Sequence, residues 1–429
     1  MSAPAYEMDG TAAIERSLFA KVTVRLLLPI ALLTFVNAID RMNISFAGAA
    51  LSRDLGLSPS AFGAGVSLFF VAYLLFQYPH ALLLRRWGLR NWLLLSVSLW
   101  GVASVSMAYA SAPWHFYSVR FLLGMAEAGF APGMTWLISQ WAPARMRGRA
   151  LSIALVAVPI ALVLGGPLCG FLLGMSNPLE VAGWRWMFLV SAIPNFVLAI
   201  AAWFYFVDGP AEARWLSPDE RALLDSQNVA QAPEVRGGLD ARDGRLWRCA
   251  LVWLCVMTGA YALVYWLPQL VRQLAPGEAE LLIGTLSALP QAGIAAGLLL
   301  NAWHSDRSGE RVRHVAAAAL LGGLAMLIAA GVPSGGLTLG LLTLAGLGVG
   351  AAQGVFWTLP AALGIGGGRP SVEAIALISM FGTAGGIIGP WLLGVLVQGT
   401  GSFTMGIGVL AALLVVAAAI VFTFREVTQ

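Results

Sequence analysis

Four charged side chains lie within long apolar stretches of this sequence. Asp40 and Arg41 interrupt one apolar run, and Arg120 and Glu127 interrupt another. An ionisable side chain near the centre of a lipid bilayer costs about 2.5 kcal/mol or more, so such residues are rare there and mark ion or substrate pathways. Two acids and two bases in this setting offer proton exchange and anion binding. The sequence therefore predicts that these two runs carry the function.

The spacing of these residues places them on shared helix faces. Asn37, Asp40 and Arg41 stand at positions i, i+3 and i+4, which lie on one face of a helix. Arg120 and Glu127 are seven residues apart, which is two turns and about 10.5 Å along another helix. We expect the two acids and two bases to face one cavity.

A charge cluster of this kind can couple two ligands. Removal from water favours the protonated form of a carboxyl group, whereas a neighbouring arginine favours the charged form. An anion that occupies the arginine therefore leaves the carboxylate easier to protonate, and proton and anion bind together. The alternative is that each pair is a structural ion pair that only positions helices.

Composition indicates that the surrounding elements are membrane helices. Hydrophobic residues make up 59% of the chain and charged residues 11%, against about 25% charged in soluble domains. Apolar stretches of about 20 residues are long enough to span a bilayer as helices, and no alternating pattern typical of a barrel is present. We predict an all-α membrane protein with twelve transmembrane helices. Their approximate ranges are 24–50, 62–84, 92–110, 113–141, 149–173, 184–207, 246–272, 280–303, 314–332, 337–364, 372–398 and 402–424.

Basic residues predict the orientation. Apart from Arg41 and Arg120 in the membrane, only Arg53, Arg185 and Arg272 fall in odd-numbered connections, and the other Lys and Arg lie in the termini and even-numbered connections. The positive-inside rule then places both termini in the cytoplasm. The polar first 20 residues lack the features of a signal peptide, so we expect them to remain as a cytoplasmic tail.

One long hydrophilic segment divides the chain. We predict an amino-terminal six-helix half over 1–207, a cytoplasmic linker over 208–245 and a carboxy-terminal six-helix half over 246–429. Ser217 and Glu220 have the spacing of a capping box, which predicts a short helix through about Leu224. Six helices plus six is typical of transporters built from two repeated halves, with the site between them near mid-membrane.

Two connections carry related basic turns. The segments Leu84–Arg90 and His304–Arg311 follow the second and eighth predicted helices. Both resemble the cytoplasmic loop signature G-x-x-x-D-R-x-G-R-R of the major facilitator superfamily, and the second copy keeps its Asp-Arg-x-Gly core. The resemblance implies that Asp306 and Arg307 form a cytoplasmic gate between the halves. The alternative reading, basic residues that follow topology beside a glycine that ends a helix, explains the first copy about as well.

Further segments narrow the resemblance to one branch. They are Asn37–Asn43, Arg120–Gly129, Gly183–Leu189, Phe206–Pro210 and Trp215–Arg221, and they are similar to the anion:cation symporter family. That branch includes bacterial carriers of galactonate, glucarate, hexuronates, tartrate and phthalate, and the animal sialic-acid (sialin-type) and vesicular glutamate transporters. The resemblance implies secondary transport of an organic anion, driven in bacteria by protons, in the inner membrane.

The family also implies roles for individual residues. Asp40 and Glu127 match its protonation sites, Arg41 matches the arginine that holds the substrate carboxylate, and Arg120 matches the arginine beside the acid of the fourth helix. Tyr73 matches a tyrosine that binds substrate. An arginine suits this task because its guanidinium group stays charged and presents a planar fork to a carboxylate.

Other polar and aromatic residues are candidates for the cavity wall. Tyr261, Tyr265 and Gln269 repeat every four residues and share a face of the seventh helix, and Asn37 and Trp357 are further candidates. Aromatic residues at this spacing are as often packing residues or interface anchors. For Trp357 and for Gln353 and Thr358, packing or bonds between helices are equally good explanations.

The eleventh helix departs from the family pattern. Sugar-acid carriers commonly have Asn-x-x-Gly-Asn ahead of a Gly-Pro pair, whereas this chain has Ser379-Met380-Phe381-Gly382-Thr383. Ser379 and Thr383 offer two hydroxyls in place of two amides. We therefore favour a smaller or less hydroxylated carboxylate, aromatic or short aliphatic, and sugar acids remain an alternative.

Several classes of protein are disfavoured. An enzyme is disfavoured because the sequence contains neither a nucleophile paired with a base nor residues at metal-ligand spacing. A channel is disfavoured because two charged helices do not supply a continuous polar lining. Nucleic-acid binding is disfavoured because the basic residues follow the membrane topology and carry no interleaved aromatic residues. We expect no cofactor, a monomer in membrane lipid, and a small organic anion and protons as ligands. His80, His115, His304 and His314 fall at helix ends, and we assign none to proton relay. A uniporter or anion exchanger of the same fold remains an alternative to the symporter.

Overall fold

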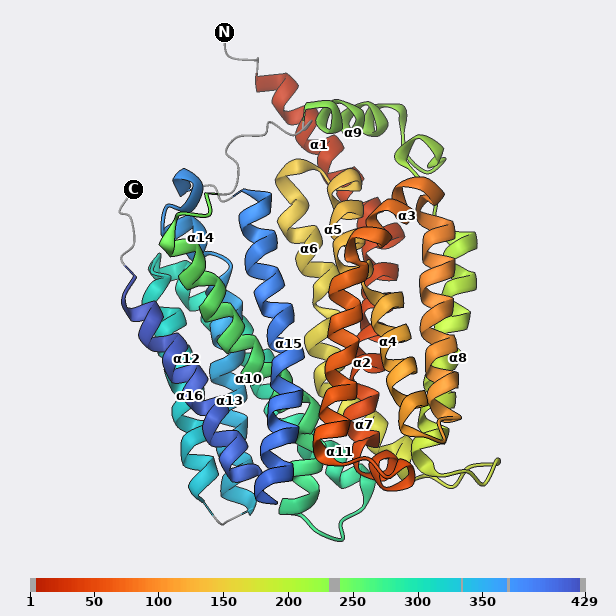
Figure 1. The fold of residues 1–429 in the computed structure, drawn as a ribbon. Coiled ribbons are helices and arrows are strands. Elements are labelled where there is room, and N and C mark those ends of the chain that lie inside the picture. The colour runs from red at the N-terminus through yellow and green to blue at the C-terminus, as the bar shows by residue number, and fades with distance from the viewer. Residues whose placement is uncertain (1–4, 231–239, 333–334, 369–370, 425–429) are drawn as a thin grey trace.

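The computed structural model describes residues 5–230, 240–332, 335–368 and 371–424, and the described chain is helical with connecting turns (Figure 1). Within these residues, eleven segments are long and apolar enough to cross a membrane. The helices that form them are α2 (Leu28–Leu55), α3 (Pro59–Ala108), α4 (Pro113–Glu127), α5 (Phe130–Trp141), α6 (Arg147–Leu155), α7 (Ala157–Gly174), α8 (Gly183–Tyr205), α10 (Gly244–Leu274), α11 (Glu280–Ser308), α12 (Val312–Gly331), α13 (Gly335–Phe356), α15 (Val372–Thr400) and α16 (Phe403–Phe422).

Helix α3 accounts for two crossings. Its 50 residues would extend about 75 Å as one helix, more than twice the roughly 30 Å of hydrocarbon in a bilayer. Gly88 interrupts it with φ 76° and ψ 171°, a left-handed conformation that glycine adopts without a Cβ clash. The chain reverses there, so the eleven segments make twelve crossings, as the apolar runs predict.

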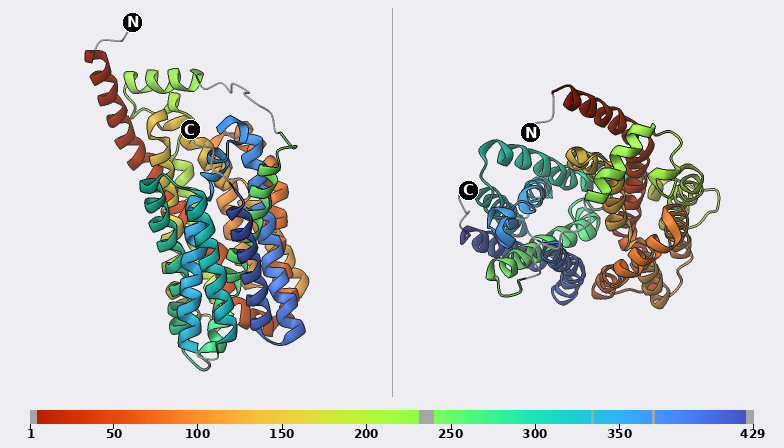
Figure 2. Two further views of the ribbon diagram at one scale, coloured as in Figure 1. Left: turned by 90° about the vertical axis from the view of Figure 1, so that its left-hand side faces the viewer. Right: turned by 90° about the horizontal axis from the view of Figure 1, so that it is seen from above.

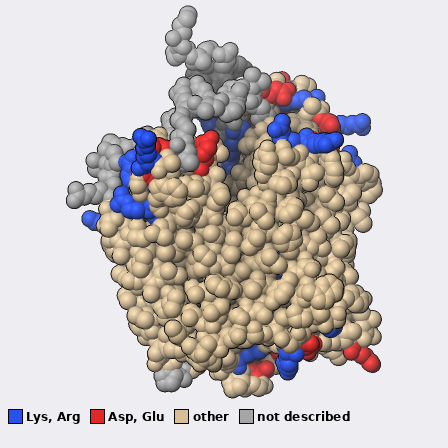
Figure 3. Space-filling model, viewed as in Figure 1, with Lys and Arg blue, Asp and Glu red and all other residues tan. Residues whose placement is uncertain are grey.

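On the face seen in Figure 3, surface charges gather at the two ends of the molecule. Both termini and the connection between α8 and α10 lie at one end (Figure 1), and Figure 3 shows an almost uninterrupted uncharged band between the charged ends. We refer to the end with the termini as the cytoplasmic end, following the distribution of basic residues. From above, the helices up to α8 and those from α10 onward form two groups side by side (Figure 2).

The linker contains the predicted capping box. Ser217 N donates to Glu220 Oε2 at 2.8 Å, and Glu220 N donates to Ser217 Oγ at 3.2 Å. The helix α9 that begins there spans Pro218–Ala230. It is longer than predicted because the six residues after Leu224 contain no proline or glycine to end it.

The same carboxylate joins the linker to the amino-terminal helix α1 (Ala5–Val22). Lys21 Nζ lies 2.8 Å from Glu220 Oε2, and Ser17 Oγ donates to Glu220 Oε1 at 2.9 Å. Burial opposes the charge, but the hydrogen bonds from Lys21, the Ser217 amide and Ser17 hold the pKa of Glu220 below its usual range. An ion pair and a hydrogen bond on this carboxylate therefore link α1 and α9. Helix α1 leads into α2 through a π-helical turn, Thr23–Leu27.

The predicted fourth helix, 113–141, is broken in the structure. Helix α4 ends at Glu127 and α5 begins at Phe130. A Cβ on Gly129 would overlap the side chain of His80 on α3, so the break lies close against that helix. Discontinuous helices are typical of transporter sites, and the break places Glu127 at a helix end.

The two halves meet near the end opposite the termini. Along α3, Gly63 abuts the Pro390 carbonyl of α15 and Ser67 Oγ donates to the Ile387 carbonyl at 2.6 Å. On the other side of the bundle, Gly166 of α7 and Gly284 of α11 each face the other's backbone carbonyl so closely that neither has room for a Cβ. Small residues let helix backbones approach in this way.

We expect Gly284→Ala to destabilise the protein. Its Cβ would meet the Gly166 carbonyl far inside van der Waals distance, and overpacking of this kind costs about 1–3 kcal/mol. Thermal unfolding of the purified protein measures the loss. Gly340→Ala is the matched control, since nothing lies within 4 Å of a Cβ there. Equal melting temperatures for the two variants would contradict the close contact.

Candidate functional site

A cavity of about 300 Å³ lies between the two halves. Its lining comes from α2, α3, α5, α10 and α15 and consists of Arg41, Phe69, Phe70, Tyr73, Gln77, Ala131, Pro132, Tyr261, Ser379 and Thr383. On both α3 and α15 the lining residues lie on the cytoplasmic side of the residues through which the halves touch. The halves therefore close the cavity off from the opposite, extracellular end.

Arg41 and Glu127 form an ion pair at the wall of the cavity. Arg41 Nε lies 2.5 Å from Glu127 Oε2, and the Glu127 side chain is fully buried. The guanidinium carbon lies 4.9 Å from the Tyr73 ring centroid and 5.4 Å from that of Phe69. The two Nη nitrogens of Arg41 have no partner among the described residues. Glu127 thus orients the guanidinium group and leaves its outer edge available to an anion.

Arg120 is enclosed beside this pair rather than exposed to the cavity. It is 1% exposed, and its Nε and Nη2 lie 3.4 Å from the carbonyl oxygens of Gly65 and Val66. Its guanidinium carbon is 4.8 Å from the Phe69 ring centroid, on which Arg41 also rests. Arg120 therefore adds positive charge behind the cavity wall and holds α4 against α3.

Asp40 faces away from the cavity, into the amino-terminal half. Asn195 Nδ2 of α8 donates to Asp40 Oδ2 at 2.6 Å. Asn43 Nδ2 is 3.5 Å from Asp40 Oδ1 and donates to Ser191 Oγ at 2.8 Å. Consecutive helix residues are about 100° apart, which turns Asp40 toward α8 while Arg41 turns to the cavity. The expectation that both acids and both bases face one cavity is therefore only partly met.

Asn195 is a site residue that the sequence prediction missed. It is an amide inside an apolar helix, a signal of the same kind as those used for the charged residues. Gln77, which lines the cavity, was missed too, although it stands four residues after Tyr73 on the same face. Both were identifiable from the sequence by their polarity and spacing.

The remaining candidates divide by position. Tyr73, Tyr261, Ser379 and Thr383 line the cavity. The two hydroxyls donate to helix carbonyls, Ser379 to Ile375 at 2.9 Å and Thr383 to Ser379 at 3.2 Å, so they present acceptor lone pairs to a ligand. The cavity wall is therefore largely aromatic, with one guanidinium group, one amide, two aliphatic hydroxyls and the hydroxyls of the two tyrosines.

Other candidates lie outside the lining. Tyr265 is buried beside Phe70, with ring centroids 5.9 Å apart, and Gln269 lies against Gly48 of α2. Trp357 is 42% exposed and packs edge-on against Trp253. Asn37 is buried on α2.

The predicted gate residues lie at the cytoplasmic end of α11. Asp306 Oδ1 is 2.7 Å from Arg311 Nη1, and the Arg307 guanidinium carbon is 4.0 Å from the ring centroid of Trp303. Both contacts stay within the α11–α12 turn. In the described residues no group of three or more His, Cys, Asp or Glu is placed to hold a metal ion.

Comparison with known proteins identifies relatives over nearly the whole chain. Residues 30–364 match the family model "Major Facilitator Superfamily". The chain is 38% identical over 410 residues to a putative tartrate transporter of Agrobacterium vitis, covering 94% of each protein. It is 34% identical over 399 residues to a quinolone resistance transporter of Acinetobacter baumannii, covering 92% of this chain and 91% of the relative.

A solved structure has the same fold. It is a bacterial homologue of the human lysosomal transporter Spinster in an inward-facing and occupied conformation. The TM-score is 0.77 with 18% sequence identity, over 94% of this chain and 96% of that one.

We expect Asn195→Leu to destabilise the protein through Asp40. The change removes the shortest hydrogen bond to a buried carboxyl group, and leaving such a group unsatisfied costs about 1–3 kcal/mol. A double-mutant cycle with Asp40→Leu, followed by thermal unfolding, isolates this contact. With Leu at position 40 the Asn195 change should cost less; an unchanged cost would show that Asn195 acts independently of Asp40.

Proposed function

This chain belongs to the major facilitator superfamily, a family of secondary transporters and not of enzymes, and we propose that it takes up a small organic carboxylate together with protons by alternating access. The observation that carries the proposal is the Arg41–Glu127 pair at the cavity wall, with the outer edge of Arg41 free. It is a multi-pass membrane protein, and we place it in a bacterial inner membrane.

In this proposal Arg41 holds the carboxylate of the substrate. Glu127 occupies the Nε edge of the guanidinium group, and the substrate takes the Nη pair in a bidentate contact, the geometry for which arginine is suited. Tyr73 supports the guanidinium group through its ring face. Arg120 strengthens the attraction for an anion without touching it.

Competition for Arg41 provides the coupling. A bound anion shares the positive charge that otherwise stabilises the Glu127 carboxylate, so proton binding at Glu127 and anion binding at Arg41 favour one another. A protonated Glu127 releases Arg41 wholly to the substrate. Asp40, held by Asn195, is the second proton site in this scheme, and it acts through α2, on which Arg41 is the next residue.

The cavity favours a compact substrate with a flat or apolar body. Phe69, Phe70, Tyr73 and Tyr261 supply ring faces. Apart from the Nη pair of Arg41, free donors in the lining come only from Gln77 and the tyrosine hydroxyls. An aromatic or short aliphatic carboxylate fits this lining best. A hydroxylated acid such as tartrate, for which one relative is named, is the second candidate, since Ser379 and Thr383 can accept its hydroxyl protons.

Asp306 and Arg307 form the cytoplasmic gate in this proposal. In a state closed to the cytoplasm, their present contacts within the α11–α12 turn exchange for contacts across the halves. In this proposal the residues that lie near the cavity but outside its present lining come to surround the substrate when the halves rearrange. They are Tyr265, Gln269, Asn37 and Trp357.

We expect Glu127→Gln to abolish proton-driven accumulation in proteoliposomes. Glutamine keeps the shape but has no proton to exchange, so substrate counterflow should be partly retained. Glu278→Gln, an exposed residue in the α10–α11 connection, is the control and should accumulate normally. Full accumulation by Glu127→Gln would argue for a uniporter or exchanger and against coupling through this residue.

We expect Arg41→Ala to lose anion binding. A charge-assisted hydrogen bond contributes about 1.5–3 kcal/mol, which corresponds to roughly 10- to 100-fold in affinity. A stability screen against carboxylates, from gluconates through tartrate to hydroxy-aromatic acids, measures the binding and identifies the substrate. Arg41→Lys should bind more weakly than wild type because it lacks the fork, whereas Arg53→Gln, exposed on the same helix, should behave as wild type. A normal shift in Arg41→Ala would make Arg41 structural.

A further inference from the structure

A second cavity, of about 490 Å³, lies at the cytoplasmic ends of α11, α12 and α13, within the carboxy-terminal half. Its lower wall is apolar and includes Leu300, Leu321 and Leu347. Its cytoplasmic end is polar and is formed by Asn301, His304, Arg313 and His314. None of these residues takes part in the transport site described above.

This cavity opens on the outer surface of the bundle, where membrane lipid lies. Leu300 is 60% exposed and Leu321 is 36% exposed, and exposed leucines on a transmembrane helix contact hydrocarbon. Trp303, next to His304, is 54% exposed and carries Arg307 against its ring. Such tryptophans lie at the level of lipid headgroups. The polar end of the cavity is therefore at headgroup level and its apolar wall is at the level of the acyl chains.

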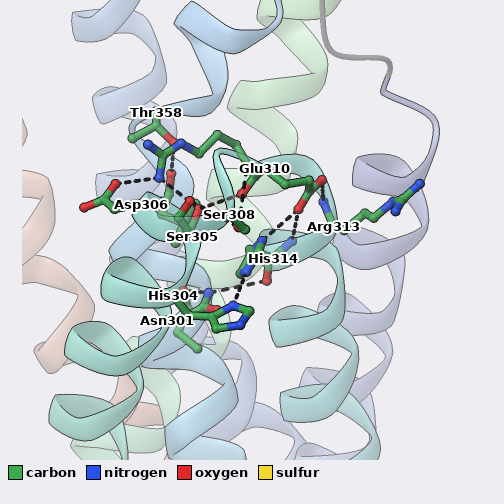
Figure 4. A network of polar contacts seen from close by, with 12 residues as sticks. Asn301, His304, Ser305, Asp306, Ser308, Glu310, Arg313, His314 and Thr358 are labelled. Carbon is green, nitrogen blue, oxygen red and sulfur yellow. Dashed lines mark hydrogen bonds and ion pairs between the residues drawn. The ribbon is translucent and has the colours of Figure 1, made fainter.

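The polar end contains a chain of three titratable groups (Figure 4). His314 Nδ1 is 2.7 Å from Glu310 Oε2, and His304 Nδ1 is 2.7 Å from His314 Nε2. Burial opposes the charge of Glu310, but hydrogen bonds from the Arg313 amide and from His314 hold its pKa below the usual range. His314 Nδ1 therefore donates to a carboxylate. The sequence places His304 and His314 at helix ends, and the structure brings their rings into contact there.

The chain of hydrogen bonds determines what His304 offers outward. A neutral His314 accepts at Nε2, so His304 Nδ1 donates to it and His304 Nε2 has a lone pair. One further proton on the histidine pair makes Nε2 of His304 a cationic donor. That nitrogen has no partner among the described residues.

Arg313 supplies a permanently positive group. Its side chain is exposed and makes no hydrogen bond, ion pair or ring contact with another described residue, although its backbone amide donates to Glu310. Of the two nearby acids, Glu310 accepts hydrogen bonds from His314 and two backbone amides, and Asp306 is paired with Arg311. The α13 side of the cavity adds only apolar residues, Leu347 and Ala351. The turn carries three arginines, Arg307, Arg311 and Arg313, against these two acids, so the net charge at headgroup level is positive.

We propose that this cavity binds an anionic phospholipid of the cytoplasmic leaflet. The phosphate contacts Arg313 and His304, and one acyl chain lies along Leu300, Leu321 and Leu347. Basic crevices between helices at the cytoplasmic surface are suited to such headgroups. Because the same turn carries Asp306 and Arg307, a bound lipid stabilises the present arrangement of α11 and α12.

The test uses purified full-length protein in nanodiscs of equal parts phosphatidylglycerol and phosphatidylcholine, with retained lipid counted by native mass spectrometry. Wild type should retain phosphatidylglycerol in preference to phosphatidylcholine. The variant His304→Gln/Arg313→Gln should lose about tenfold in this preference, since each basic residue near the surface contributes about 1 kcal/mol. Arg145→Gln, an exposed arginine of the other half, should retain it. Wild-type retention by the double variant would overturn the proposal.

A second variant separates a lipid from a free anion. Ala317 lines the apolar wall, and Ala317→Phe fills the groove while both cationic residues stay. Retention of phosphatidylglycerol should fall in this variant as well, and excess inorganic phosphate should not displace the lipid from wild type. Undiminished retention in Ala317→Phe, or displacement by phosphate, would show that no acyl chain occupies the groove.

Discussion

The Arg41–Glu127 ion pair is the contact on which the organisation of the central cavity depends. A fully buried carboxylate and a guanidinium group in apolar helices are tolerable only together, since removing either partner leaves an uncompensated charge. The pair fixes α2 relative to α4. Glu127 is the last residue of α4, directly before the break that separates α4 from α5. The rings of Phe69 and Tyr73, which lie against the Arg41 guanidinium group, then hold that group at the cavity wall. The positions of α2 and α4, the Arg41–Glu127 ion pair and the lining of the cavity therefore depend on one another.

Contacts inside the amino-terminal half differ in kind from contacts between the two halves. Within the amino-terminal half, Asp40, Asn43, Ser191 and Asn195 form a buried hydrogen-bonded cluster, which resists change because each partner would lose a hydrogen bond. Between the halves, contacts such as that of Gly166 with Gly284 are mainly backbone against backbone. Such surfaces can separate without leaving a buried charge. The buried polar cluster therefore lies inside one half, whereas the boundary between the halves is made mainly of close backbone contacts crossed by a few hydrogen bonds.

The sequence predicts the number and order of crossings well because hydrocarbon thickness dictates helix length independently of tertiary contacts. It predicts the pairing of Arg41 with Glu127 less directly, since 86 residues separate them, and it places Asp40 on the wrong side. Positions i, i+3 and i+4 share a face, but a helix buried on all sides has partners in every direction. The contact between His304 and His314 was missed for a related reason, because it depends on how tightly the turn between α11 and α12 closes at Gly309.

The contacts of Glu220 attach helix α9 to the amino-terminal half. One of the Glu220 oxygens accepts from both the Ser217 amide and Lys21, so the group that starts α9 also holds α1, which runs into α2. Displacing α9 from α1 would break the contacts of Glu220 with Lys21 and Ser17, whereas the capping box, which is internal to α9, would remain. Helix α9 is therefore attached to the amino-terminal half, although the hydrophilic segment between the halves begins before it. The hydrophilic segment as far as Ala230 is therefore attached to the amino-terminal half rather than standing free between the halves.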